Sequence, residues 1–187
     1  MHTEFELKFL WVDHDALQKQ ITSLWWSLVQ DEVLMKRVIF DLPGDGEFIR
    51  VRDEWDQITM TYKKMNSQAI DGTKELNLVV DDFDTAVSML ECTGMMSCSY
   101  QESYRMMYEL DGCEVCFDRW PGISDYVEIE WATQVSVEQV IGKLWLDVET
   151  WFGGTVNSIY EQELWFVPWE LQTIIRLTFD NPPQSRL

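Results

Sequence analysis

The stretch Glu4-Phe5-Glu6-Leu7-Lys8-Phe9 alternates charged and apolar side chains one residue at a time. Successive side chains of a β-strand point to opposite faces of a sheet, so this alternation predicts a strand with one charged and one apolar face. Taken alone, such a strand is ordinarily half-buried, with its charged face in water. Whether that face lies in water or inside the fold depends on the strands that follow.

Later segments repeat the alternation, with charged or polar groups two residues apart. In chain order these groups are Arg50 and Arg52; Thr59, Thr61 and Lys63; Glu75 and Asn77; Glu128 and Glu130. Arg and Glu are not favoured in strands, yet they recur here in pairs. The two signs are also largely separated by strand, with Lys8 as the exception. A sheet closed with this face inward would form a barrel lined by both charges, with helices covering its apolar outside.

Turn residues separate the predicted strands, most of which follow one another as hairpins. We expect strands at 3–11, 33–41, 47–52, 57–64, 74–80, 99–110, 114–119 and 126–131. Helices are expected from Asp13 or Asp15 to about Gln30, from Asp82 to about Cys92 and from Ser136 to about Leu146, with 150–160 irregular. Hairpins rather than βαβ units indicate an antiparallel sheet and the α+β class.

The formal net charge is −19, from 33 acidic and 14 basic residues. A surface this acidic repels a nucleic-acid backbone and an anionic membrane, so we expect neither as a partner. A small anionic substrate is compatible with this charge where basic residues gather, and Arg50, Arg52 and Lys63 lie close together in the sequence.

The cysteines include one motif, Cys113-x-x-Cys116, with the spacing of many metal and redox sites. It lies in an alternating stretch, where residues three apart point to opposite faces of a strand. No second such motif and no nearby histidine accompany it. We therefore expect unpaired thiols, which suit a reducing environment, and a cytoplasmic protein.

A lumen lined by both charges suits a metal-bound polyphosphate. Carboxylates hold hard divalent cations such as Mg²⁺ or Mn²⁺, and Arg and Lys neutralise phosphoryl oxygens. Phosphoryl transfer depends mainly on positioning and charge stabilisation. The two histidines, His2 and His14, both lie near the N-terminus, which disfavours a histidine-based metal site or triad.

The first motif, Glu4-Phe-Glu6-Leu-Lys8, resembles the E-x-E-x-K signature of the CYTH, or triphosphate tunnel metalloenzyme, superfamily. The resemblance extends over about residues 3–163 through Phe48-Ile-Arg50-Val-Arg52, Thr61-Tyr-Lys63, Lys74-Glu75-Leu-Asn77, Tyr104-Arg105, Asp118-Arg-Trp-Pro-Gly122 and Glu128-Ile-Glu130. It implies an α+β fold: an eight-stranded antiparallel β-barrel tunnel with a charged lumen and helices packed outside. The superfamily includes class IV adenylyl cyclases, thiamine triphosphatases and inorganic triphosphatases.

The resemblance also implies roles for the matched positions. The metal ligands, for Mg²⁺ or Mn²⁺, would be Glu4, Glu6, Glu75, Asp118, Glu128 and Glu130. The triphosphate would be held by Lys8, Arg50, Arg52, Lys63 and Arg105. Lys8, which would orient the reacting phosphate, and Asp118 are the expected catalytic residues.

Two positions depart from the family pattern. Asn77 stands where a second Glu is usual, and Ser103 stands where a Lys is frequent, two residues before Arg105. Losing one carboxylate and one cation keeps the lumen roughly balanced, but bears on metal affinity, substrate size and activity.

The expected function is that of a metal-dependent enzyme acting on a small triphosphate such as ATP, thiamine triphosphate or tripolyphosphate. Triphosphate hydrolysis and the class IV conversion of ATP to cyclic AMP and pyrophosphate use the same scaffold, so the motifs do not separate them. Asn77 and Ser103 favour an alternative, a non-catalytic triphosphate- or polyphosphate-binding module. The mixed-sign lumen disfavours a third, a plain acidic structural protein.

We expect two parts along the chain: a tunnel domain at 1–165, then an apolar segment and flexible tail at 166–187. Pro168 interrupts the apolar run from Trp165 to Leu177, so a helix there would begin at or after it. The segment should pack on the chain's own barrel or, in a symmetric homodimer, against a second subunit, so the protein is a monomer or a homodimer.

Overall fold

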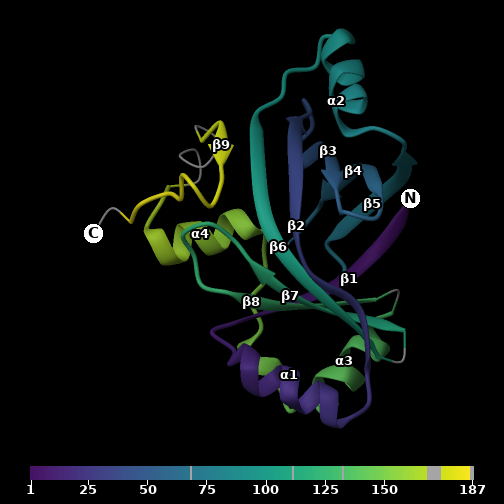
Figure 1. Cartoon of the computed structure of the whole chain (residues 1–187), viewed down its shortest axis with the longest axis vertical. Coiled ribbons are helices and arrows are strands. Elements are labelled where there is room, and N and C mark those ends of the chain that lie inside the picture. The colour runs from purple at the N-terminus through teal and green to yellow at the C-terminus, as the bar shows by residue number, and fades with distance from the viewer. Residues whose placement is uncertain (68, 111, 132, 168–173, 186–187) are drawn as a thin grey trace.

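The computed structural model describes residues 1–67, 69–110, 112–131, 133–167 and 174–185 (Figure 1). Its elements, in chain order, are β1 (His2–Leu10), α1 (His14–Ser23), β2 (Ser27–Asp41), β3 (Glu47–Asp53), β4 (Ile58–Met65), β5 (Thr73–Val80), α2 (Phe83–Cys92), β6 (Ser99–Leu110), β7 (Cys113–Arg119), β8 (Tyr126–Trp131), α3 (Gln134–Lys143), the 3-10 turn Val148–Thr150, α4 (Val156–Leu164) and β9 (Arg176–Leu177).

The first eight strands close into a barrel in the order β2-β3-β4-β5-β1-β8-β7-β6, and β6 returns to β2. All pairings within this ring are antiparallel, as predicted. β1 joins the two halves, since it pairs with β5 over His2–Glu4 and with β8 over Phe5–Leu10. β9 adds a short parallel pairing to the start of β6, at Tyr100 and Gln101, before the pairing of β6 with β7 begins at Tyr104. The predicted eight-stranded α+β barrel is therefore confirmed, with β9 as an addition.

Three groups of elements pack on the barrel, two of them on its apolar outer face. α1 and α3 lie side by side against β1, β7 and β8 (Figure 1), and their buried residues are Leu17, Ile21, Val137, Val140 and Ile141. α2 packs through Ala86 on Val38, Phe40 and Val51. α4 and β9 form a third cluster with residues of the β7–β8 region, namely Trp120, Tyr126, Ile159, Tyr160, Leu164 and Leu177. Of these, Trp120 and Tyr126 also line the inside of the barrel. Covering this face leaves the charged face of the strands inside.

Some predicted boundaries were wrong. The first helix ends at Ser23 rather than Gln30, because Trp25 takes a left-handed backbone with φ 61° and β2 begins at Ser27. Thr133, not Ser136, caps α3, since its side chain accepts from the Ser136 N–H. The stretch predicted to be irregular, 150–160, contains the first part of α4, which is capped by Thr155.

Part of the C-terminal segment packs on the chain's own barrel. The Tyr100 N–H donates to the Ile175 carbonyl at 2.8 Å, and Leu177 is buried. The helix predicted after Pro168 falls on residues 168–173, outside the described residues, and the division of the chain at 165 stays a prediction. All four cysteines are described and no disulfide joins them. Within the described residues, no helix has the length and apolar character needed to cross a membrane.

Candidate functional site

The inward faces of the strands enclose a cavity of about 550 Å³. Its charged lining comes from β1 to β8 and the β3–β4 turn: Glu6, Lys8, Arg37, Asp41, Arg50, Arg52, Glu54, Lys63, Glu75, Arg105, Glu114, Glu128 and Glu130. Thr155, Val156 and Asn157, at the N-terminal end of α4, also contribute to the lining. The sequence prediction of a lumen lined by both signs is thus met by the geometry.

A carboxylate cluster forms where β1 meets β8. Strand register sets Glu6 opposite Glu130 and Lys8 opposite Glu128. One carboxylate oxygen from each of Glu6, Glu128 and Glu130 lies within 4.8 Å of the others. The Lys8 ammonium contacts Glu6 Oε1 at 2.9 Å and Glu128 Oε1 at 2.7 Å. Burial opposes the charge on Lys8, but these carboxylates raise its pKa well above the ordinary value, so it is a cation at neutral pH.

Arg105 links the same cluster to Asp118. Its Nε and Nη2 atoms donate to the two oxygens of Asp118 at 2.8 and 2.6 Å, and Nη2 also donates to Glu128 Oε2 at 2.5 Å. Asp118 is only 1% exposed and is not among the residues that line the cavity. It therefore holds Arg105 from behind, while its predicted roles as metal ligand and catalytic residue stay predictions.

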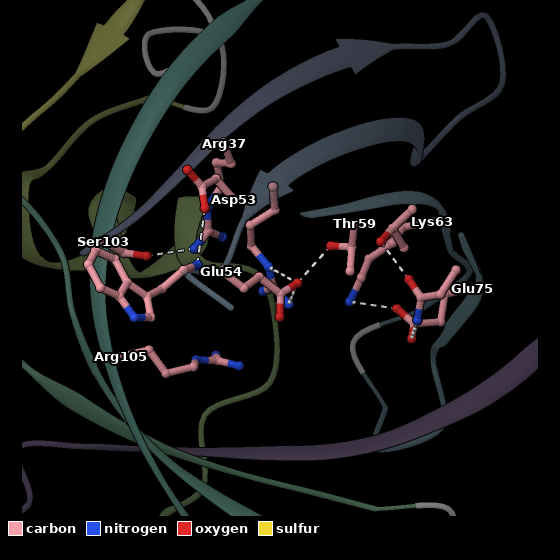
Figure 2. A network of polar contacts seen from close by, with 12 residues as sticks. Arg37, Asp53, Glu54, Thr59, Lys63, Glu75, Ser103 and Arg105 are labelled. Carbon is pink, nitrogen blue, oxygen red and sulfur yellow. Dashed lines mark hydrogen bonds and ion pairs between the residues drawn. The ribbon is translucent and has the colours of Figure 1, made fainter. Parts of the chain in front are cut away.

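On β3 to β5, each of two further cations has a carboxylate beside it (Figure 2). Lys63 Nζ lies 3.2 Å from Glu75 Oε2. The Arg52 Nε and Nη2 atoms both lie 2.7 Å from Glu54 Oε1, which also accepts from Thr59 at 2.6 Å. The cations that would bind an anion are thus held in place by short carboxylate contacts.

Asn77, the first departure from the family pattern, joins two strands on the lumen side. Its Oδ1 accepts from Thr61 at 2.5 Å, and its Nδ2 donates to Glu75 at 2.7 Å. The amide thus orients Glu75, a service that a carboxylate at this position could not provide because it has no donor.

The structure brings nine of the predicted site residues into one cavity: Glu6, Lys8, Arg50, Arg52, Lys63, Glu75, Arg105, Glu128 and Glu130. The backbone of Glu4 pairs with Thr73, but its side chain lies outside what the structure describes. The roles of these residues as metal ligands and triphosphate-binding groups stay predictions.

Sequence reasoning missed Arg37, Glu54 and Trp120 as lumen residues. Arg37 lies on β2 opposite Arg52, donates through Nη2 to Ser103 Oγ at 2.6 Å and stacks 4.4 Å from the Trp120 ring centroid. Its neighbours on the inner face of β2 are Met35 and Ile39, so no pair of charges at i, i+2 marked it. The sequence signal is a single Arg or Lys between apolar residues on one face of a predicted strand, and a search for it would have found Arg37.

The CYTH domain model matches residues 2–149, and the chain belongs to the CYTH domain family. A conserved hypothetical protein from Pyrococcus furiosus is similar, with a TM-score of 0.72 at 20% identity over 84% of this chain and 99% of that one. A candidate adenylate cyclase from Vibrio parahaemolyticus gives 0.72 at 16% identity, over 86% and 98%. HpAC1 from Hippeastrum, a candidate adenylyl cyclase described as having a dominant triphosphatase activity, gives 0.58 at 14% identity, over 91% and 99%. At these identities the likeness establishes the fold alone. No curated protein matches the chain.

Proposed function

We propose that this protein is a metal-dependent enzyme that acts on the triphosphate group of a small substrate inside the barrel. One observation carries the proposal: a three-carboxylate cluster and a set of buried and partly buried cations line the same cavity of about 550 Å³. Carboxylates suit a hard divalent cation, and the cations suit phosphoryl oxygens. Neither group alone would point to a triphosphate.

The donor chemistry of the cluster fits Mg²⁺ or Mn²⁺. Glu6, Glu128 and Glu130 would hold the ion, with Glu4 and Glu75 as further candidates, because hard cations take oxygen ligands. Bound there, the ion would act as a Lewis acid that neutralises charge on phosphoryl oxygens. The chain's own contribution is then to hold the substrate with Arg50, Arg52, Lys63 and Arg105, and to orient the reacting phosphate through Lys8.

Two reactions fit this arrangement: hydrolysis of the triphosphate, and conversion of ATP to cyclic AMP and pyrophosphate. The similar proteins support both, since one is named as a candidate adenylate cyclase and HpAC1 is described by its triphosphatase activity. The second candidate function is a binding module that does not turn over its ligand. Asn77 favours it, because the amide replaces a carboxylate at a position where the family usually has one.

The test is to incubate the purified protein with Mg²⁺ or Mn²⁺ and, separately, ATP, tripolyphosphate or thiamine triphosphate. Free phosphate would identify a hydrolase, and cyclic AMP with pyrophosphate a cyclase. The variant Glu128→Gln should lose the activity, whereas Glu138→Gln, which removes the same charge from an exposed position of α3, should keep it. Binding without product would favour the binding module, and absence of binding would contradict the proposal.

A further inference from the structure

Arg37 differs in its partners from four of the other lumen cations. Lys8, Arg52, Lys63 and Arg105 each contact a carboxylate. Among the described residues, Arg37 forms no such ion pair: its contacts are the Ser103 hydroxyl and the face of Trp120. Its side chain is nevertheless buried, with the residue 8% exposed. A buried guanidinium without an anion is costly, so its position needs an explanation.

The surroundings of Arg37 increase that cost. β2 and β3 place Arg37 directly opposite Arg52, and like charges in this relation repel. Burial, followed by Arg52, Arg50 and Arg105, holds the pKa of Arg37 well below its ordinary value. Positive charge is therefore in excess at this point of the lumen, in a protein whose net charge is −19.

Hydrogen-bond donors are in excess at the same point. Arg37 Nε and Trp120 Nε1 are both buried and have no acceptor. Both residues line the cavity and lie in contact with each other, with the guanidinium 4.4 Å from the indole centroid. Buried donors are normally paired, so two neighbouring exceptions indicate that an acceptor from outside the chain completes them.

We propose that Arg37 and Trp120 form an oxyanion subsite that receives one phosphoryl group of the triphosphate. The inference rests on the proposed function and adds a binding residue from β2 to it. Ser103 fixes the position of the subsite, because it holds Arg37 and lies two residues, or about 7 Å, from Arg105 along one face of β6. A phosphoryl group beside Arg105 thus has a second cation one step further along the lumen. Its oxygens supply both the charge and the acceptors that the protein lacks there.

Calorimetric titration with tripolyphosphate in the presence of Mg²⁺ tests the subsite. Arg37→Gln should weaken binding roughly ten- to a hundredfold, the effect of losing a hydrogen bond to a charged group. Trp120→Phe, which keeps the ring and removes the Nε1–H, should also weaken it. The control Arg119→Gln removes the same charge from the outer surface, where Arg119 pairs with Glu32, and should bind as the wild type does.

The melting temperature measured without tripolyphosphate separates a binding role of Arg37 from a structural one. Because Arg37 faces Arg52 without a carboxylate of its own, Arg37→Gln should melt at the same temperature as the wild type or higher. A lower melting temperature with unchanged affinity, or equal affinity in all variants, would overturn the subsite and leave the proposed function intact. A wild type that binds no tripolyphosphate would overturn both.

A second, independent observation concerns the backbone. Among the described residues, every non-glycine residue with positive φ is a tryptophan: Trp11, Trp25, Trp55, Trp145 and Trp165, at 52° to 79°. All five are between 65% and 93% exposed. A left-handed backbone is a true outlier for a bulky residue, and glycine is its usual occupant.

The ends of three helices show what these positions require. In α1, α2 and α3 the residue after the C-cap donates to the carbonyl three residues back, and the next residue to the carbonyl five back. This is the Schellman motif, whose left-handed position is ordinarily glycine. That position holds Gly94 in α2, but Trp25 in α1 and Trp145 in α3.

Three further tryptophans have the burial and backbone that are usual for this residue. Trp120 is 4% exposed, and Trp26 and Trp151 pack against the main core, each with a negative φ. The tryptophans whose side chains the structure describes therefore form two groups, one buried or partly buried and one exposed at the ends of elements. The exposed tryptophans have the positive φ that is usual for glycine, and their side chains are not buried in the core.

We infer that glycine occupies positions 11, 25, 55, 145 and 165 when the gene is translated in its native organism. The codon UGA links the two residues, because some genetic codes read it as tryptophan and others as glycine. The five exposed tryptophans are then not an interaction surface.

The gene and two variants test this inference. UGA codons should occur at the five positions and UGG at Trp26 and Trp120, and UGG at all five would overturn it. Trp25→Gly and Trp145→Gly should each raise the melting temperature by roughly 2–8 °C, because a left-handed conformation is strained for a residue with a Cβ. The control Trp26→Gly should lower it by removing core packing. No rise in either variant would show that tryptophan suits these positions.

Discussion

The Arg105–Asp118 contact permits a quantitative test that is independent of the reaction. Arg105→Gln would leave Asp118, 1% exposed, without its guanidinium, while Glu128 would keep Lys8 as a partner. Removing one partner of a buried ion pair costs about 3–5 kcal/mol, since the other charge is left desolvated. For a domain of this size each kcal/mol lowers the melting temperature by about 2–4 °C. The expected fall is therefore roughly 6–20 °C.

Urea unfolding followed by circular dichroism would measure the loss, with thermal melts in parallel. The control is Arg119→Gln, whose ion pair with Glu32 is more than 40% exposed on both sides and worth about 0–1 kcal/mol. Its stacking on Tyr104 adds about 0.5–1 kcal/mol, which keeps the control below the loss expected for Arg105→Gln. The double variant Arg105→Gln/Asp118→Asn should recover part of the loss, because no buried charge is left alone at Asp118. If Arg105→Gln lost no more than Arg119→Gln, the reasoning from burial would be refuted.

Three further outcomes are expected. Mg²⁺ or Mn²⁺ at a hundredfold above Kd should raise the melting temperature by roughly 5–11 °C, since binding then adds about 2.7 kcal/mol. Glu130→Gln should abolish this rise and Glu138→Gln should keep it, whereas equal rises in both variants would mean that the ion binds elsewhere. Burial opposes the charge of Glu54, but Arg52 and Thr59 hold its pKa below the ordinary value, so its contribution to stability is present above about pH 4.5 and is lost as the pH falls through the lowered pKa. The free energy of unfolding, measured at a series of acid pH values, should fall less steeply for Glu54→Gln than for the wild type, and parallel curves would contradict this. Leu177→Ala should cost about 2–5 kcal/mol and the exposed Ile175→Ala within about 0.5 kcal/mol in urea melts, and equal costs would show that β9 does not pack on the barrel.

The barrel could be predicted from the sequence because the strands that line its lumen alternate charged and apolar residues. Pairs such as Arg50 and Arg52, repeated on several strands, fix which face of each strand is polar. Alternation does not fix register, so the placement of Glu6 opposite Glu130 came only from the structure. The end of the first helix was misplaced for a related reason: the apolar stripe continues past Trp25 into β2, and periodicity alone carries no stop signal there.

The site was predictable where charges recur and not where they stand alone. Arg37 shares its face with Met35 and Ile39, and Glu54 lies in a predicted turn, from which its carboxylate turns back to Arg52. Asp118 shows the opposite limit. Its motif indicated a site residue, but only the fold shows that the side chain faces Arg105 behind the cavity wall.

The two departures from the family pattern now carry different weight. Ser103 suggested a lost cation, yet its hydroxyl accepts from Arg37 at 2.6 Å, so a guanidinium from β2 supplies positive charge beside it. A lysine at 103 would add an ammonium beside that guanidinium and increase the repulsion. Charge balance therefore belongs to the lumen as a whole, and Ser103 gives no reason to expect a binding module. Asn77 alone still favours that alternative, and Asn77→Glu separates the two cases: restored turnover would assign the missing activity to this one carboxylate, whereas wild-type turnover would show that none was missing.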